Sequence, residues 1–275
     1  MADTQIHLHI DLGGLPNRMQ RVLNAAMNFV AIGLNSAPGI TTDSFAIPDT
    51  PIQHQFDSNN PWTADQAKEA WRIWILRNGF RDAAEAISGT LEEVQAVLSS
   101  WHIAELQKAR GSLFGEDWNK FVVQRGQQFH RRTLPQRLEF LEKNYSFTLD
   151  SALLDQVNTI NLVRNCLAHR GGVITTLDLN VEGALEVRWT ALVALVISDG
   201  SEVEIHPPHF VEAGASLAIA NRPKSKRLAI GQQVDFTSLE FAQMCWTFFL
   251  FAQSCAKRLE DYGRQRGVQF GQSAT

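Results

Sequence analysis

Hydrophobic residues recur at the spacing of an amphipathic helix over most of this chain. Ser88-Gly89 separates an expected helix that ends at about residue 88 from one that begins at Thr90. Thr90 and Glu93 form a capping box for the helix that begins there. Most connections between these stretches are short, which is typical of a helical bundle. The expected helices cover residues 15–33, about 62–79, about 80–88, 90–106, 116–129, 134–143, 151–169 and 239–262.

Two stretches depart from this helical pattern. Residues 34–61 contain several prolines and many small polar residues without a sustained period, as a long loop does. Residues 173–236 are rich in Val, Ile, Leu and Thr, and Asp199-Gly200 is a hairpin turn signal. The expected strands cover 6–10, 173–179, 184–198, 202–206, 211–220 and 227–236. The pattern predicts a mainly α fold, a helical bundle with a small antiparallel β insertion before the last helix.

These elements divide the chain into consecutive parts. We expect an N-terminal helix and long loop over 1–62, a helical bundle over 63–172, a β insertion over 173–236, the closing helix of the bundle over 237–262 and a polar tail over 263–275. The closing helix is apolar nearly all round, and the helix before the insertion ends exposed. One chain is therefore not expected to bury every apolar face, and a homodimer would complete the core.

Composition narrows the class of protein. With 44% hydrophobic and 20% charged residues, the 275-residue chain has the balance of a soluble globular protein. Its formal net charge of −4 argues against a general nucleic-acid coat, so any RNA contact must depend on a local patch. The apolar stretch 241–256 is interrupted by polar residues and is shorter than the roughly 20 residues of a membrane span. We interpret it as a buried helix and expect no membrane contact.

The cysteines and the first residues indicate a cytoplasmic location. Cys166, Cys245 and Cys255 form no CxxC pair and leave an odd count, which fits a reducing compartment. The opening residues lack the basic and apolar regions of an export signal. The phosphate loops of nucleotide hydrolases, the G-x-S-x-G elbow and H-E-x-x-H are absent from the sequence, which disfavours nucleotide and serine hydrolases.

The stretch from Asn161 to Gly172, NLVRNCLAHRGG, carries the strongest candidate chemistry. It ends an apolar run with helical period, for which Asp150 or Ser151 offers an N-cap. Gly171 can supply the left-handed residue beyond the C-terminus. His169 is thereby expected in the last turn of a helix.

Arg164, Asn165 and His169 make this helix end a candidate phosphate site. Arg164 and His169 lie roughly 140° apart around the axis, and Asn165 sits one turn beneath His169, where an amide can orient the imidazole ring. None of the residues three or four positions from Arg164 is acidic. A guanidinium without a local partner beside a titratable ring is suited to hold a phosphate.

Arg164-Asn165, three further residues and His169 resemble the R-N-x-x-x-H signature of the HEPN superfamily, helical proteins that include many metal-independent endoribonucleases. Residues 133–147 and the Gly171-Gly172 pair are similar to the same family, so the resemblance covers 133–174. It implies a HEPN-like bundle, a two-fold dimer that brings two motifs to one cleft, and RNA as the substrate. Such proteins often serve as toxins or phage-defence effectors, which would make an antitoxin protein a partner.

RNA cleavage without a metal needs a base for the 2′-hydroxyl proton, an acid for the leaving 5′-oxygen and positive charge at the transition state. His169 can move protons near neutral pH, and Arg164 can hold the phosphate in its planar fork. By resemblance, Asn165 would position the ring or contact the phosphate, and the family dimer would supply the second proton-transfer group. The products would be a 2′,3′-cyclic phosphate and a 5′-hydroxyl, with no metal or cofactor.

Other residues are weaker candidates for RNA contacts. Arg131 and Arg132 lie in a basic turn beside His130 that can follow an RNA backbone or simply end a solvated helix. Arg170 directly follows the motif histidine. The seven tryptophans mostly share helix faces with Ala, Ile and Leu, so we expect them in the core before they serve as base-stacking platforms.

Two other interpretations stay open. A histidine in the last turn also meets the negative end of the helix dipole, and Arg164 can pair with an acid from another helix, which would give a non-catalytic HEPN-like dimeric binding or scaffold protein. His7 and His9 are similar to the metal-binding H-x-H of amidohydrolases, although this chain lacks their barrel repeat. His206 and His209 can chelate in principle, but the prolines between them indicate a turn.

Overall fold

The computed structural model describes residues 11–41, 62–110, 119–198, 201–205, 216–268 and 270. Its helices are α1 (Gly14–Ser36), α2 (Ala64–Arg110), α4 (Arg125–His130), α5 (Leu134–Tyr145), α6 (Ser151–His169) and α7 (Ser238–Gln265). Short turns of other helical types are η1 (Ala37–Gly39), η3 (Asn119–Gln124) and η4 (Thr176–Asp178). The strands are β1 (Ala184–Ser198), β2 (Ser201–Ile205) and β3 (Ser216–Ala229). The expected fold class is confirmed, since helices dominate and a small antiparallel sheet precedes the last helix.

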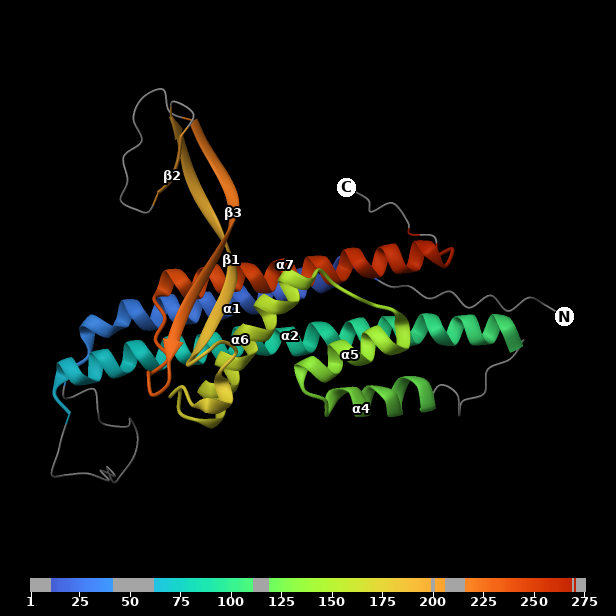
Figure 1. The fold of residues 1–275 in the computed structure, drawn as a ribbon, viewed down its shortest axis with the longest axis horizontal. Helices are drawn as coiled ribbons and strands as arrows, with labels where there is room; N and C mark the ends of the chain where they lie inside the picture. The colour runs from blue at the N-terminus through green and yellow to red at the C-terminus, as the bar shows by residue number, and fades with distance from the viewer. Residues whose placement is uncertain are drawn as a thin grey trace.

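Helices α1, α2 and α7 lie side by side and form the body of the bundle (Figure 1). Their buried faces meet in a shared core that includes Leu23 of α1, Phe80 of α2 and Phe248 of α7. The contact between α1 and α2 is close because Gly79 has no side chain: a Cβ there would lie 2.2 Å from Cγ2 of Val30. Packing therefore requires glycine at this position.

The closing helix α7 is the central helix of the molecule. It packs against α1, α2, α6 and β1, so its apolar residues are covered on nearly all sides within one chain. Phe241 is 2% exposed, and Phe248, Phe251 and Leu259 are 0% exposed. The expected buried helix over 241–256 is confirmed, and its all-round apolar surface gives no reason for a dimer.

Helix α2 is one continuous helix of 47 residues, where the sequence pattern predicted three. The predicted break at Ser88-Gly89 is wrong because Thr90 does not cap a new helix: its hydroxyl donates a hydrogen bond of 3.0 Å to the Ala86 carbonyl oxygen, one turn earlier. A glycine within a helix costs only about 1 kcal/mol relative to alanine. Packing of α2 along α1 and α7 outweighs this cost.

The sheet has the strand order β2-β1-β3, and the long pair of β1 and β3 projects from the bundle (Figure 1). β3 continues through Pro223, where the sequence predicted a loop between two strands. Thr190, opposite Pro223, directs its N–H and C=O toward Thr247 of α7. The donor that proline lacks therefore falls on the outer edge of the sheet, and the pairing with β1 is not interrupted.

The strands predicted at 173–179 and 227–236 are mostly wrong. Val173 and Gln233 form only an isolated bridge, the turn η4 follows, and β3 already ends at Ala229. The strand expected at 6–10, most of the loop expected over 34–61 and residues 206–215 lie outside the described residues.

β3 pairs with one edge of β1 along residues 184–197, but β2 pairs with the other edge only at residues 194–198. Along the rest of that edge no described strand pairs with β1, and side chains of the helices form hydrogen bonds with its backbone. The Thr159 hydroxyl of α6 accepts a hydrogen bond of 3.0 Å from the Arg188 N–H. The Thr247 hydroxyl of α7 accepts one of 2.9 Å from the Thr190 N–H and donates one of 3.1 Å to the Thr190 carbonyl oxygen. These bonds fix α6 and α7 against β1 and so fix the position of α6 in the fold.

Candidate functional site

Helix α6 begins and ends where the sequence predicted. The Asp150 carboxylate accepts a hydrogen bond of 3.0 Å from the Leu153 N–H and caps the N-terminus. After His169 the chain leaves the helix through Gly171 and Gly172, whose φ angles of 60° and 81° lie in the left-handed region. His169 therefore stands in the last turn of α6, and it is exposed.

Two contacts place the end of α6 beside α2. A guanidinium nitrogen of Arg164 lies 2.7 Å from Oε2 of Glu85. Gly172 lies against Arg77, since a Cβ on that glycine would be 3.4 Å from Cζ of Arg77. The part of α6 that begins at Arg164, together with the turn after it, therefore lies beside residues 77–85 of α2, and Figure 1 shows α6 crossing α2 at an angle.

His169 lies between these two contacts in the sequence, and Arg81 lies between their partners on α2. Arg81 is exposed and, in the part of the chain that the structure describes, makes no hydrogen bond or ion pair. It was not expected from the sequence, although Arg77, Arg81 and Glu85 recur every four residues and so share one face of a helix. Arg81 thus adds an exposed guanidinium on the stretch of α2 that the end of α6 contacts.

Arg164 has no acidic neighbour on its own helix, as predicted, but Glu85 of α2 supplies a partner. The expectation of an unpartnered guanidinium is therefore wrong. The side chain of Arg164 is 33% exposed and that of Glu85 is 60% exposed. Exposed ion pairs contribute only about 0–1 kcal/mol, so a phosphate can compete with Glu85 for the guanidinium.

Asn165 contacts a different neighbour from the one that the sequence suggested. Its Oδ1 accepts a hydrogen bond of 3.2 Å from the Arg164 guanidinium. Among the described residues, no hydrogen bond joins Asn165 to His169. The amide thus contacts the guanidinium and not the imidazole ring.

Cys166, inside the motif, is a packing residue. Its side chain is buried, and its thiol donates a hydrogen bond of 3.2 Å to the Val173 carbonyl oxygen. Burial raises the pKa of this thiol. A thiol that stays protonated in the core is not a nucleophile.

Arg170 braces the turn that follows α6. Its guanidinium donates two hydrogen bonds to the Asp178 carboxylate, and the one from Nε to Oδ2 is 3.0 Å long. Asp178 is fully buried. Burial by itself would raise the pKa of this carboxyl group, but the hydrogen bonds from Arg170 and Thr175 lower it below its usual value. The guanidinium is thus engaged within the fold and does not face a phosphate.

Arg131 and Arg132 lie in the turn between α4 and α5. Arg131 is exposed, whereas the Arg132 guanidinium lies over the ring of Phe140 in α5, 4.9 Å from the ring centroid. Buried Arg137 holds the turn against α2 by donating hydrogen bonds to the carbonyl oxygens of Arg132 and Ser88. Ser88 lies one turn beyond Glu85, and Figure 1 shows the turn and the end of α6 on the same side of α2. Arg131 is therefore an exposed cation on the side of α2 that carries the motif.

The side chains at the end of α6 suit a phosphate and not a metal cation, because they are guanidinium groups, an amide and an imidazole. No group of three or more His, Cys, Asp or Glu residues within the described ranges is arranged to hold a metal ion. His7, His9, His206 and His209, the histidines considered for metal binding, lie outside those ranges.

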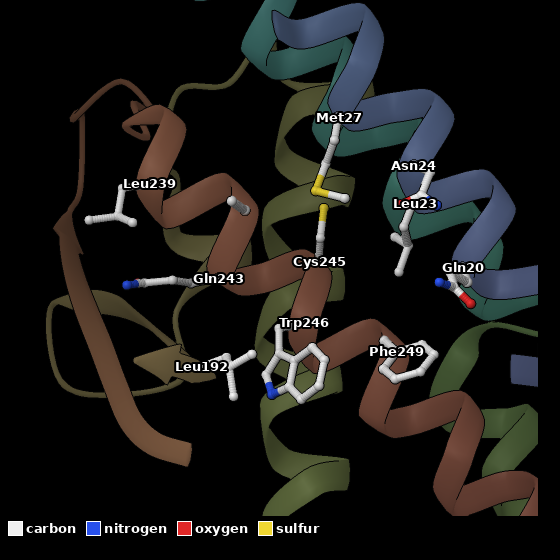
Figure 2. A pocket seen from close by; sticks show the side chains of 11 residues that line it. Gln20, Leu23, Asn24, Met27, Leu192, Leu239, Gln243, Cys245, Trp246 and Phe249 are labelled. Carbon is white, nitrogen blue, oxygen red and sulfur yellow. The ribbon is translucent and has the colours of Figure 1, made fainter. Parts of the chain in front are cut away.

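A cavity of about 330 Å³ opens between α1, α7 and β1 (Figure 2). The sulfur atoms of Met27 and Cys245 face each other in it, and the Trp246 indole lies at one side (Figure 2). Burial raises the pKa of the Cys245 thiol to about 12, so this group stays protonated. The polar side chains of the lining are otherwise the amides of Gln20, Asn24 and Gln243. The described residues that line this cavity offer no group for acid-base or nucleophilic catalysis.

Within the described ranges, no helix has the combination of length and hydropathy that a membrane span needs. Comparison with protein-family models, with curated proteins and with solved structures found no match for this chain. The functional assignment therefore depends on the geometry at the end of α6 and on the signature that this helix carries.

Proposed function

We propose that this protein is a metal-independent endoribonuclease of the HEPN type, which cleaves RNA by attack of a 2′-hydroxyl on the adjacent phosphate. The observation that carries the proposal is the exposed His169 in the last turn of α6, little more than one turn beyond Arg164, where the end of this helix contacts the stretch of α2 that carries Arg81. The reaction requires proton transfer at a phosphodiester whose transition state gains negative charge. In this proposal the His169 imidazole transfers the proton, and the guanidinium groups of Arg164 and Arg81 supply the positive charge.

Each side chain has a defined task in this proposal. His169 exchanges the proton of the 2′-hydroxyl or of the leaving 5′-oxygen. Arg164, aligned by Asn165, holds the scissile phosphate together with Arg81. Since one imidazole cannot be base and acid at the same instant, a second copy of the chain supplies the other proton-transfer group in a shared cleft. The products are a 2′,3′-cyclic phosphate and a 5′-hydroxyl.

A second candidate is a non-catalytic RNA-binding or scaffold module that uses the same surface. The ion pair between Arg164 and Glu85 favours it, because the guanidinium already has a partner without a ligand. A phosphate must displace Glu85, whose negative charge also opposes the charge of the transition state. The two candidates differ in whether RNA is cleaved and whether His169 is needed for it.

Cleavage of mixed RNA in EDTA by the wild type and by His169→Ala tests the proposal. We expect the wild type to cleave in the presence of the chelator and the variant to lose about 10²–10⁴-fold of the rate, the usual contribution of a general acid-base group. His130→Ala is the matched control, because His130 is also exposed but is held by Glu92, with 2.7 Å between Nδ1 and Oε1. It should cleave at the wild-type rate.

Two results would overturn the nuclease proposal: a requirement for a divalent cation, or an unchanged rate in His169→Ala. Analysis of the product ends adds an independent check, because 3′-hydroxyl ends would exclude attack by the 2′-hydroxyl. Binding of RNA by the pure wild type without cleavage would instead support the second candidate.

A further inference from the structure

We propose that one face of α2 is a track for single-stranded RNA, on which an unpaired base stacks on Trp74 while neighbouring phosphates bind Arg81 and Arg164. This inference rests on the proposed function for the identity of the ligand, but it concerns a separate site on the first turns of α2. It names single-stranded RNA as the substrate class and base stacking as the means of recognition.

Trp62, Trp71 and Trp74 form a tryptophan surface at the start of α2. Trp62 and Trp74 are 58% and 54% exposed. The expectation that tryptophans lie in the core is therefore wrong for these two, while Trp101 and Trp189 are buried as expected. A cluster of large apolar side chains that stay exposed often marks a binding surface.

The tryptophan surface is fixed in place. The rings of Trp71 and Trp74 are stacked, with 5.3 Å between their centroids and 17° between their planes. The Trp71 indole N–H donates a hydrogen bond of 2.7 Å to the Gly33 carbonyl oxygen in α1, which anchors the inner ring. Trp74 thus offers a ring that loses little side-chain freedom when a ligand stacks on it.

The space beside these tryptophans suits the neutral face of a base. A cavity of about 640 Å³ adjoins them. That volume is within the range of small-molecule sites. The described residues that line it are uncharged, and they include Ile40, Ala67, Ala70 and the three tryptophans. Among these described residues a phosphate finds no partner, so the phosphates of a bound strand must lie elsewhere.

The cations that such a strand needs lie on the same face of α2. At 3.6 residues per turn, Arg81 and Glu85 each lie about 20° from Trp74 around the helix axis, on opposite sides. With a rise of 1.5 Å per residue, Trp74 is about 10 Å from Arg81 and about 16 Å from Glu85 along the axis. Since Arg164 pairs with Glu85, a few nucleotides of extended RNA span the distance from the base platform to both guanidinium groups.

The local charge fits this path although the whole chain is acidic. The net charge of −4 provides no general attraction for RNA. Arg81 is exposed and, within the described ranges, has no ion pair, so its charge is available to a phosphate. An aromatic side chain followed by cations is the combination by which proteins bind single strands without base pairing.

A protein segment is the other ligand that exposed tryptophans can bind, as in the grooves that accept proline-rich peptides. Such a segment would use Trp62 and Trp74 but would have no need of a guanidinium on the same face. The alignment of Arg81 with Trp74 therefore favours RNA.

The test compares Trp74→Ala with Trp74→Phe, both in the full chain with His169→Ala so that the RNA stays intact. Fluorescence anisotropy follows binding of a labelled oligouridylate at fixed salt. We expect Trp74→Ala to bind about 5- to 150-fold more weakly, which corresponds to about 1–3 kcal/mol per stacked base. Trp74→Phe should retain most of the affinity because phenylalanine also stacks. Ile219→Ala is the control, since Ile219 is 74% exposed on β3, away from α2.

Failure of the track can be told from failure of the nuclease proposal. A dinucleoside monophosphate bound at the end of α6 is too short to reach Trp74, so Trp74→Ala with His169 intact should lose far less of its cleavage rate on this substrate than on longer single-stranded RNA. If the wild type cleaves no RNA but Trp74→Ala still weakens binding, only the nuclease proposal fails. Equal affinity of Trp74→Ala and its parent for single-stranded RNA would overturn the track and would leave the tryptophan surface to a protein ligand.

Discussion

At the scale of single residues, the site depends on the balance of charge at Arg164. Its guanidinium has two partners, the Glu85 carboxylate at 2.7 Å and the Asn165 amide oxygen at 3.2 Å. The amide aligns the guanidinium without changing its charge. The carboxylate lowers the positive potential at the place where a phosphate would bind. Glu85 therefore competes with an anionic ligand for the same guanidinium.

Glu85→Gln should raise the affinity for single-stranded RNA by about 1.4- to 5-fold, because exposed ion pairs contribute about 0.2–1 kcal/mol and glutamine removes only the charge. Anisotropy titrations at several salt concentrations measure the change. Glu69→Gln is the matched control, since Glu69 pairs with Arg72 within α2, at 2.8 Å and on another face of the helix. Weaker RNA binding by Glu85→Gln would show that the carboxylate positions Arg164 instead of competing with phosphate.

At the scale of elements, the features that the sequence predicted correctly are those fixed by local interactions. Helix α6 begins just after Asp150 and ends just before Gly171 because a cap and a left-handed glycine act on residues only a few positions away. The break expected at Gly89 is absent because the packing of α2 comes from α1 and α7, which are remote in sequence. β3 passes Pro223 because Thr247 satisfies the backbone of Thr190, 57 residues earlier.

The candidate site likewise contains residues that the local sequence predicts and residues that only the tertiary structure brings in. Arg164 and His169 are visible in the sequence because both belong to one short motif on one helix. Glu85, the partner of Arg164, lies 79 residues earlier, and nothing in the spacing within either helix connects them. Arg81 and Trp74 can be recognised as candidate binding residues only once α6 is known to cross α2 near residues 77–85.

The turn after α6 includes the ion pair between Arg170 and buried Asp178, and the contribution of this pair to stability should depend on pH. Asp178→Asn removes the charge that Arg170 binds and should lower the free energy of unfolding at neutral pH by about 1.5–3 kcal/mol, as for hydrogen bonds to charged groups. The pKa of Asp178 is lowered in the folded protein. Its stabilisation is therefore complete above the unfolded pKa of about 3.9 and is lost as the pH falls through the folded value.

Urea denaturation of the wild type and Asp178→Asn at a series of pH values measures this effect. The difference in free energy should be largest near neutral pH and should shrink below about pH 4. Asp155→Asn serves as the control, because Asp155 pairs with Arg188 on the surface, at 2.9 Å. A difference that stays constant down to pH 3 would contradict a role for the Asp178 charge.

At the scale of the whole molecule, α2 is the scaffold on which the candidate functions are arranged. Trp74, Arg81 and Glu85 follow one another on one face, and the basic turn between α4 and α5 is attached further along, at Ser88. A single chain buries the closing helix α7, so apolar surface on that helix no longer calls for a second copy. The proposed dimer now depends on chemistry, because one His169 cannot provide both the base and the acid.

Mixing of active and inactive chains tests this requirement. If two His169 rings share one cleft, a His169→Ala chain should inactivate the wild-type chain with which it pairs. After subunit exchange, equal amounts should reduce the activity per wild-type chain to about half, and a tenfold excess should reduce it to about one-tenth, as random pairing in a two-fold dimer dictates. Chains mixed immediately before the assay, before exchange, are the control, and sedimentation velocity shows whether the dimer exists at the assay concentration. Activity that no excess of His169→Ala reduces would mean that each chain is a complete catalyst, with its acid and its base on the same chain.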